Sequence, residues 1–245
     1  MQFTSGLELL IRYDKSMVDF SPVLQRVLAS AARLQEVVPD AVLVGDSAAA
    51  LHAGHRDSFG HHHVLSDLVD RYEVVLEAVE ATEGWATSVR ASKPPFTIMG
   101  RLGGVEAGLR QMRRTRPLET FEVDVGEDAK VVAPTAEEAL RVKAFLVVQR
   151  NVVRDYLDVV ALADHLGHEA AVAILSDIDS YYDDRSGERG SVLTSLVLAL
   201  ADPQPRDTDV IDELPRYKGL NERYHRWSDV VDVCRSLALR LGGAA

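Results

Sequence analysis

Residues 41–65 read AVLVGDSAAALHAGHRDSFGHHHVL and decide how the chain folds. The apolar run 41–44 ends in Gly45, and a segment of small residues continues to Gly54, an order that predicts a strand, a tight turn and a helix. A second strand is expected over residues 61–65. Because a glycine turn that leads into a helix leaves backbone N–H groups pointing outward, Gly45 and Ser47 are candidates for a phosphate site. Many α/β turns have this pattern, so it does not decide the function alone.

The segments around this stretch predict the rest of a mixed sheet and its covering helices. An amphipathic helix is expected over residues 21–38, with Ser21 as its cap and Pro22 at the first helical position. A second long helical pattern covers residues 66–82. Four short β-prone segments, separated by glycine, proline and charged residues, predict further strands at 85–91, 96–102, 118–125 and 130–133.

From Thr135 onward the pattern is almost entirely helical. Thr135 and Glu138 form a capping-box pattern that leads into an apolar helix. Helices are expected over 135–150, 151–166, 168–184, 192–201 and 221–241, with the proline-rich stretch 203–215 as the longest connection. We therefore predict an α/β domain over residues 1–134 and a helical domain over 135–245 that completes a cleft.

Composition limits the classes of protein to consider. The 245 residues are enough for a substantial core, and the single cysteine, Cys234, lies in an apolar stretch that favours core packing in a reducing cytosol. No segment approaches the roughly 20 apolar residues that a membrane span needs, so we expect a cytoplasmic protein without a membrane partner. The net charge of −11 argues against a general polyanion-binding surface. A local basic cluster, either a solvated face or a phosphate or RNA contact, contains Arg110, Arg113, Arg114 and Arg116.

Two matches far apart in the chain resemble one known family. Residues 43–58, continuing to His63, are similar to the opening of the AbiEii/AbiGii-type (MenT-like) nucleotidyltransferases, which include toxins of type IV toxin–antitoxin pairs and belong to the polymerase-β-like superfamily. That family has a Gly-Gly-Thr/Ser-Ala turn followed by Arg-x-Ser-x-Asp-x-Asp, and Arg56 and Ser58 match its arginine and serine. Downstream, Lys143 and the run 154–158, RDYLD, match a helical lysine and an Arg-Asp-x-x-Asp pattern. The resemblance covers about residues 41–166.

The resemblance implies an α+β fold, with a polymerase-β-like nucleotidyltransferase mixed sheet and helices, followed by a helical C-terminal region. By the same resemblance the catalytic residues are Ser47, Ser58, Lys143 and Asp155. The residues implied to bind the nucleotide are Gly45, Ser47, Arg56, Ser58, Lys143 and Asp158. An exposed helix face is the alternative for Lys143, and a structural pair with Arg154 is the alternative for the two aspartates.

The chain departs from the family at the metal site. The two aspartates that hold Mg²⁺ against the nucleoside triphosphate in the family correspond here to Gly60 and His62. Glycine offers no ligand, and imidazole suits Mg²⁺ poorly, so the metal ligands are unknown. Alternation along a strand also directs His61 and His63 away from His62, which argues against one shared metal ion. Asp46, in place of the second glycine, either caps the following helix or faces the phosphate pocket.

Two groups of residues have open interpretations. Glu122 and Asp124 share one face of a predicted strand that begins near Glu119, and these acids are either a third family carboxylate or the wet side of the strand. The aromatic residues of the helical half favour burial in helix packing over an RNA or partner groove. They are Tyr181, Tyr182, Tyr217, Tyr224 and Trp227.

Two functional hypotheses follow from the resemblance and the departure. The first is a nucleotidyltransferase that moves a nucleotide from an NTP to an RNA, such as a tRNA 3′ end, or to a protein. It would use Mg²⁺, and a cognate antitoxin would be its partner. The second is a catalytically inactive module of the same fold that binds a nucleotide, RNA or a partner. Gly60 and His62 are the positions that separate the two hypotheses, because nucleotide transfer in the family depends on the carboxylates that are missing there.

Overall fold

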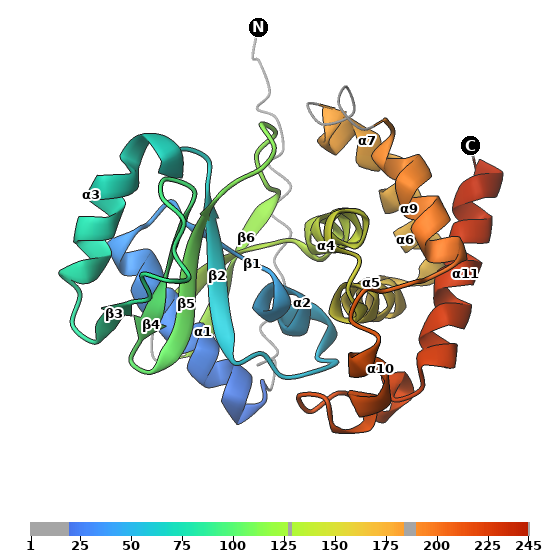
Figure 1. Cartoon of the computed structure of the whole chain (residues 1–245), viewed down its shortest axis with the longest axis horizontal. Helices are drawn as coiled ribbons and strands as arrows, with labels where there is room; N and C mark the ends of the chain where they lie inside the picture. The colour runs from blue at the N-terminus through green and yellow to red at the C-terminus, as the bar shows by residue number, and fades with distance from the viewer. Residues whose placement is uncertain (1–19, 127–128, 184–189, 245) are drawn as a thin grey trace, which may run out of the picture.

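The computed structural model describes residues 20–126, 129–183 and 190–244. Its centre is a five-stranded mixed sheet (Figure 1). In spatial order the strands are β1 (Val42–Val44), β2 (Gly60–Leu65), β5 (Val105–Gln111), β4 (Thr97–Leu102) and β3 (Trp85–Thr87). β2 and β5 are parallel, and every other neighbouring pair is antiparallel. A separate hairpin of β6 (Thr120–Gly126) and β7 (Ala129–Pro134) contacts β1 through β7.

Local sequence signals set the ends of the helices in this half. α1 (Pro22–Val37) begins at Ser21, whose hydroxyl accepts a hydrogen bond of 3.2 Å from the Leu24 N–H. α2 (Asp46–Ala53) ends at Gly54, which adopts the left-handed conformation that glycine tolerates. α3 (Leu68–Glu80) follows β2. The predicted helices at 21–38 and 66–82, and the strand–turn–helix order after residue 41, are confirmed.

The two faces of the sheet have different neighbours. α1 and α3 cover one face, where Leu34 and Leu68 pack in one core with sheet residues such as Leu109. In Figure 1, α3 lies on one side of the sheet and α4 (Ala136–Arg150) on the other. Along β2 the exposure alternates, so that His61 and His63 are fully buried while His62 is half-buried. The predicted separation of His62 from its two neighbours is confirmed.

The second half is helical and has one shared core. After α4 come α5 (Val153–Leu166), α6 (His168–Ser176), α7 (Ile178–Tyr181), α9 (Val192–Ala201), α10 (Asp209–Glu213) and α11 (Trp227–Ala244), with 3₁₀ helices η1 (Leu214–Arg216) and η2 (Glu222–Tyr224). α4 and α5 lie between the sheet and the outer helices (Figure 1). Cys234 is fully buried in this core, and burial raises the pKa of its thiol to about 12, which confirms its packing role. Across the described ranges, no single helix has the length and apolar character to cross a membrane, although the bent pair α5 and α6 passes that test together.

Several elements differ from the prediction. The stretch 203–215, expected as the longest connection, contains α10 and the start of η1, and β3 ends at Thr87 instead of residue 91. β5 was not expected, because Gly108 and the charged residues Glu106 and Arg110 give it low strand propensity, and it forms because strands pair with it on both sides. The helix predicted over 168–184 is broken at Asp177 into α6 and α7, and its last residue lies outside the described ranges. The long C-terminal helix starts at Trp227 instead of residue 221. The predicted domain boundary falls between β7 and α4, and independent folding of the two parts stays a prediction.

The buried histidines of β2 make the fold sensitive to acid. His61 Nε2 lies 3.0 Å from the Ser30 hydroxyl oxygen, and neither ring nitrogen of His63 has a hydrogen-bond partner in the part of the chain that the structure describes. Burial lowers the pKa of His61 to about 3 and holds that of His63 well below 6.5. The unfolded chain takes up protons near pH 6.5, whereas the folded chain does not. Stability is therefore complete above that pH and is lost as the pH falls from 6.5 toward 3.

We predict that the free energy of unfolding falls between pH 7 and pH 5, by at most about 1.4 kcal/mol per pH unit for each buried histidine. Urea unfolding at several pH values measures this slope. The double variant H61L/H63L should have a flatter pH profile than the parent. An equal slope in H61L/H63L and the parent would contradict the assignment.

Candidate functional site

The predicted site residues meet in one ion cluster, although they lie about a hundred positions apart in the chain. Lys143 Nζ, on α4, is 2.5 Å from Asp158 Oδ2 on α5 and 2.8 Å from Asp46 Oδ1 on α2. Arg56 donates to both carboxylate oxygens of Asp158, at 2.9 and 3.0 Å. His55 Nε2 lies 2.8 Å from Asp158 Oδ1. Residues from both sequence matches therefore lie in one cluster of ion pairs, which connects the sheet half of the protein to the helices.

The cluster is electrically balanced and almost dry. Arg150 forms a two-pronged pair with Asp155, at 2.9 and 2.5 Å. Three cations thus face three carboxylates, which are Arg56, Lys143 and Arg150 against Asp46, Asp155 and Asp158. Lys143, Asp155 and Asp158 are at most 1% exposed. Charges this far from water are tolerated only when they are paired, so each member depends on the others.

The pKa shifts follow from this pairing. Burial opposes the ionisation of Asp158, but Arg56 and Lys143 outweigh it and hold the pKa of that carboxyl below its usual range. Burial likewise disfavours the Lys143 ammonium, and the surrounding carboxylates nevertheless raise its pKa. For Asp155 burial prevails and raises the pKa. Lys143 and Asp158 are therefore fixed in their charged forms across the physiological pH range.

The two candidate serines hold α2 against β2. The Ser47 and Ser58 hydroxyl oxygens are 2.9 Å apart, and both lie within hydrogen-bond distance of the Gly60 carbonyl oxygen, at 2.6 and 3.0 Å. Both side chains are buried. Their hydroxyls thus already have partners within the protein, and the catalytic roles implied by the resemblance stay predictions.

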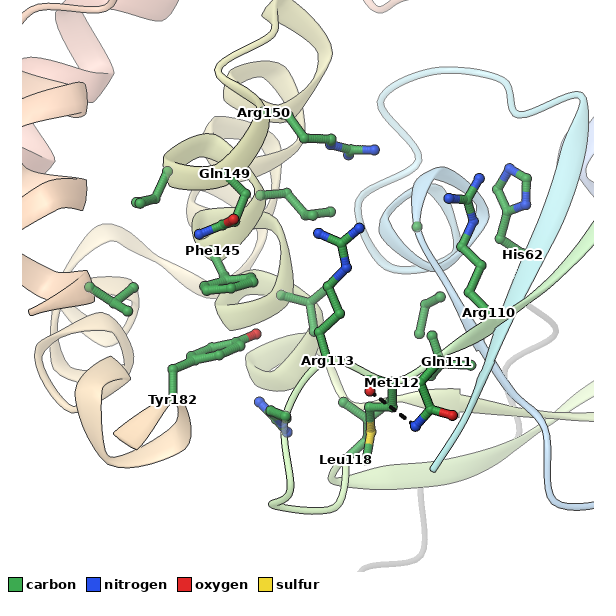
Figure 2. A pocket seen from close by; sticks show the side chains of 18 of the residues that line it. His62, Arg110, Gln111, Met112, Arg113, Leu118, Phe145, Gln149, Arg150 and Tyr182 are labelled. Carbon is green, nitrogen blue, oxygen red and sulfur yellow. Dashed lines mark hydrogen bonds between the residues drawn. The ribbon is translucent and has the colours of Figure 1, made fainter. Parts of the chain in front are cut away.

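A cavity of about 730 Å³ adjoins this cluster. It lies between the strands β1, β2 and β5 on one side and α4 and α9 on the other, and Figure 2 shows many of the side chains that line it. Of the predicted site residues only Gly45 lines the cavity, together with its neighbour Asp46 and with His62. Ser47, Ser58, Lys143 and Asp155 do not line it. The predicted residues are brought together, but their polar groups bind one another instead of facing the space.

Arginines dominate the charge of the cavity wall. The lining contains one carboxylate, Asp46, and five arginines, which are Arg110, Arg113, Arg114, Arg150 and Arg154. Figure 2 shows the side chains of Arg110, Arg113 and Arg150 extending into the cavity from different elements. Sequence reasoning singled out the first three arginines as an ambiguous basic cluster and missed Arg150 and Arg154 as cavity residues. These arginines lie at or near the ends of separate strands and helices. Only the fold brings their positive charges together around one cavity.

The arginines differ in how their charge is compensated. Arg114 is buried and pairs with Glu138 at 2.7 Å, and Arg150 pairs with Asp155. Arg110 and Arg154 have no ion pair with any carboxylate of the described ranges. Partial burial, together with Arg150, Arg113 and Arg154, lowers the pKa of Arg110. The cavity therefore concentrates uncompensated positive charge, the arrangement that attracts an anion.

The opposite side of the cavity is apolar. The rings of Phe145 and Tyr182 stack with centroids 4.1 Å apart and planes 6° apart. Val142, Leu146 and Leu118 continue this wall. A ligand with a charged end and a flat or apolar end would match both halves.

The positions of the family's metal ligands do not fit Mg²⁺ here. A Cβ atom at Gly60 would lie 2.8 Å from both the Cβ and the backbone carbonyl oxygen of Glu106 on β5, so there is no room for a side chain. His62 packs over Gly108, and burial and Arg110 lower its pKa to about 4. Asp46, the remaining carboxylate of the cavity, is already bonded to Lys143. Within the described ranges, no group of three or more His, Cys, Asp or Glu side chains is placed to hold a metal ion.

The remaining candidates have structural partners. Glu119 accepts hydrogen bonds from Arg141 and Tyr181, and Glu122 pairs with Lys130 on the exposed hairpin, which supports the interpretation of a wet strand face. Tyr181, Tyr182 and Tyr224 are buried in helix packing, as predicted. The alternative interpretation of Asp155 and Asp158 as members of structural ion pairs is supported, although their arginine partners are Arg150 and Arg56, respectively, instead of Arg154.

The mixed sheet, the glycine turn into α2 and the following helices define a nucleotidyltransferase-like fold. Among solved structures, JHP933 from Helicobacter pylori is similar with a TM-score of 0.50 and 14% sequence identity, covering 92% of this chain and 94% of that one. This likeness shows the fold alone. An antigenic nucleotidyltransferase-like protein from Paracoccidioides brasiliensis gives a TM-score of 0.44 at 15% identity, over 72% of this chain and 94% of that one.

Sequence comparison gives a different set of relatives. The heme uptake protein MmpL11 of Mycobacterium tuberculosis is 30% identical over 241 residues, covering 89% of this chain. A mycolic acid-containing lipids exporter, MmpL11 of Mycolicibacterium smegmatis, is 32% identical over 130 residues, covering 53% of this chain and 13% of that protein. The chain spans only 23% of the length of the first of these relatives. No family profile matches the chain.

We predict that Gly60→Ala destabilises the protein, because the added methyl group collides with the β5 backbone, at a cost of about 1–3 kcal/mol. Gly242→Ala is the matched control: nothing lies within 4 Å of its added Cβ, and it sits in α11, where alanine favours the helix. Thermal and urea unfolding measure both changes. Equal stability of the two variants would show that β2 and β5 are not in close contact at this point.

We predict that Lys143→Met lowers the free energy of unfolding by about 3–5 kcal/mol, because it leaves three carboxylates of the cluster facing only two cations, Arg56 and Arg150. Lys130→Met removes the same charge from an exposed pair, where Lys130 is 63% exposed, and should cost no more than about 1 kcal/mol. Urea unfolding at pH 7 compares the two. A loss for Lys143→Met as small as that for Lys130→Met would contradict the structural role of the cluster.

Proposed function

We propose that this chain is a nucleotide-binding module on a nucleotidyltransferase-like fold and that it does not perform metal-assisted nucleotidyl transfer. One observation carries the proposal: the place where a family carboxylate would hold Mg²⁺ is filled at Gly60 by the β5 backbone, next to a cavity whose wall bears five arginines. The cavity contains arginines that can attract a phosphate group, but it lacks the carboxylates that would bind the metal ion. Metal-aligned attack has no support from these residues.

Size and chemistry favour a nucleotide as the ligand. A volume of about 730 Å³ lies within the range of small-molecule sites. Guanidinium groups bind phosphate oxygens through paired hydrogen bonds, and Arg110 and Arg154 have no ion pair among the described residues that would compete. The apolar side, around Phe145 and Leu146, offers a surface for a base.

A second candidate function is nucleotide transfer from an NTP to an RNA, such as a tRNA 3′ end, or to a protein, as in a type IV toxin with a cognate antitoxin. The convergence of Lys143 and Asp158 with Arg56 favours it, because the resemblance implies the same residues. This function would require Mg²⁺ and a cytoplasmic acceptor. The pairing of these residues with one another supports the binding function more strongly.

Calorimetric titration with the four NTPs, together with a radiolabelled-NTP transfer assay on tRNA, tests the proposal. We expect saturable binding of at least one nucleotide and no labelled tRNA. Ser58→Ala serves as the discriminating variant, since Ser58 is buried outside the cavity and its loss should leave nucleotide affinity unchanged.

Two results would contradict this function. Labelling of tRNA that disappears in Ser58→Ala would identify a transferase. The absence of binding by any nucleotide would remove the proposed ligand class.

A further inference from the structure

We propose that arginines take the place of the divalent cation in this cavity and bind the triphosphate of a nucleoside 5′-triphosphate directly. The arginine cluster consists of Arg110, Arg113, Arg150 and Arg154. The inference rests on the proposed nucleotide binding and assigns the chemistry by which it occurs. Under this proposal, nucleotide binding at the cavity does not require a metal ion.

Charge accounting separates the cluster from the buried ions beside it. Lys143, Arg56 and Arg150 are balanced by the three aspartates, and Arg114 is balanced by Glu138. Arg110 and Arg154 add positive charge that no carboxylate of the described ranges offsets at ion-pair distance. A triphosphate carries three to four negative charges at neutral pH, so it could supply the missing counter-charge.

The arginines come from separate elements, and one of them is held in place before any ligand binds. Arg110 projects from β5, Arg150 from the last turn of α4, and Arg154 from the first turn of α5. Arg150 is held by both oxygens of Asp155. Figure 2 shows the Arg113 side chain pointing into the same part of the cavity as those of Arg150 and Arg110. Guanidiniums that are already held in place lose less freedom on binding than flexible side chains do.

Buried contacts fix the segment that carries Arg113. Its neighbour Arg114 donates to the backbone carbonyls of Arg116 and Pro117, at 2.9 and 3.1 Å, and pairs with Glu138 on α4. Arg114 also lies over the rings of Tyr181 and Tyr182. The Arg114–Glu138 pair therefore acts as an anchor, and Arg113 is presented from it to the cavity.

The same geometry disfavours a metal-bound ligand. A divalent cation on the phosphates would bring positive charge close to the arginine cluster, and like charges repel strongly in a partly dry site. It would also cancel two of the negative charges that the arginines attract. Free triphosphate should therefore bind more tightly than its Mg²⁺ complex, the reverse of the order expected for a metal-dependent transferase.

The test is calorimetric titration of the full chain with ATP, ADP and AMP, first in EDTA and then with excess Mg²⁺, with inorganic triphosphate as a base-free probe. We expect binding in EDTA, with affinity falling from ATP to AMP, and weakening by at least about threefold when Mg²⁺ is added. Arg110→Gln and Arg154→Gln should each weaken ATP binding by about tenfold. Arg90→Gln, which removes an exposed arginine outside the cavity, should not.

The outcomes are distinguishable. ATP binding that appears only with Mg²⁺ would overturn metal independence and leave nucleotide binding intact, whereas no binding of any nucleotide would overturn the proposed function itself. Parent-like affinity in both Arg110→Gln and Arg154→Gln would overturn the assignment to the arginine cluster. Arg154→Lys keeps the charge but loses the fork geometry, so an affinity between those of the parent and Arg154→Gln supports direct contact with the phosphates.

Discussion

The structure depends on the buried contact of Lys143 with Asp158 and on the Arg56 side chain that completes it. These groups come from α4, α5 and the loop before β2, so one set of ion pairs fixes the sheet against the helices. Taking such charges out of water is costly, and only mutual pairing offsets the cost. The two matched motifs therefore meet in one buried cluster that contributes to the stability of the fold, whether or not the protein uses them for chemistry.

Two electrostatic environments lie side by side as a result. The inner one is electrically balanced and mostly buried, because every cation in it pairs with a carboxylate. The outer one is the wall of the cavity, where Arg110 and its neighbours raise the positive potential without an equal number of acids. A protein that is acidic overall thus holds a basic pocket. Net charge describes the average surface and does not predict the sign of a single recessed site.

Much of the fold follows from signals that act over a few residues. Ser21 and Thr135 cap their helices through hydrogen bonds to Leu24 and Glu138, and the ends of these helices could be predicted for that reason. The strand β5 could not be predicted in this way, because its residues form a strand only when β2 and β4 pair with it on both sides. Part of the cavity wall consists of residues from β5. Lys143 and Asp158 were expected in one place because of a resemblance. That they bind each other instead of facing the cavity depends on packing, which the sequence pattern does not record.

Gly60 also limits how this protein could change over time. A Cβ atom at this position would lie 2.8 Å from the Cβ and the carbonyl oxygen of Glu106, so any side chain here requires its neighbours to shift. A lineage that started from this chain would have to shift one central strand before a carboxylate at that position could ligate anything. A side chain at this position would therefore lower stability before it could ligate a metal ion.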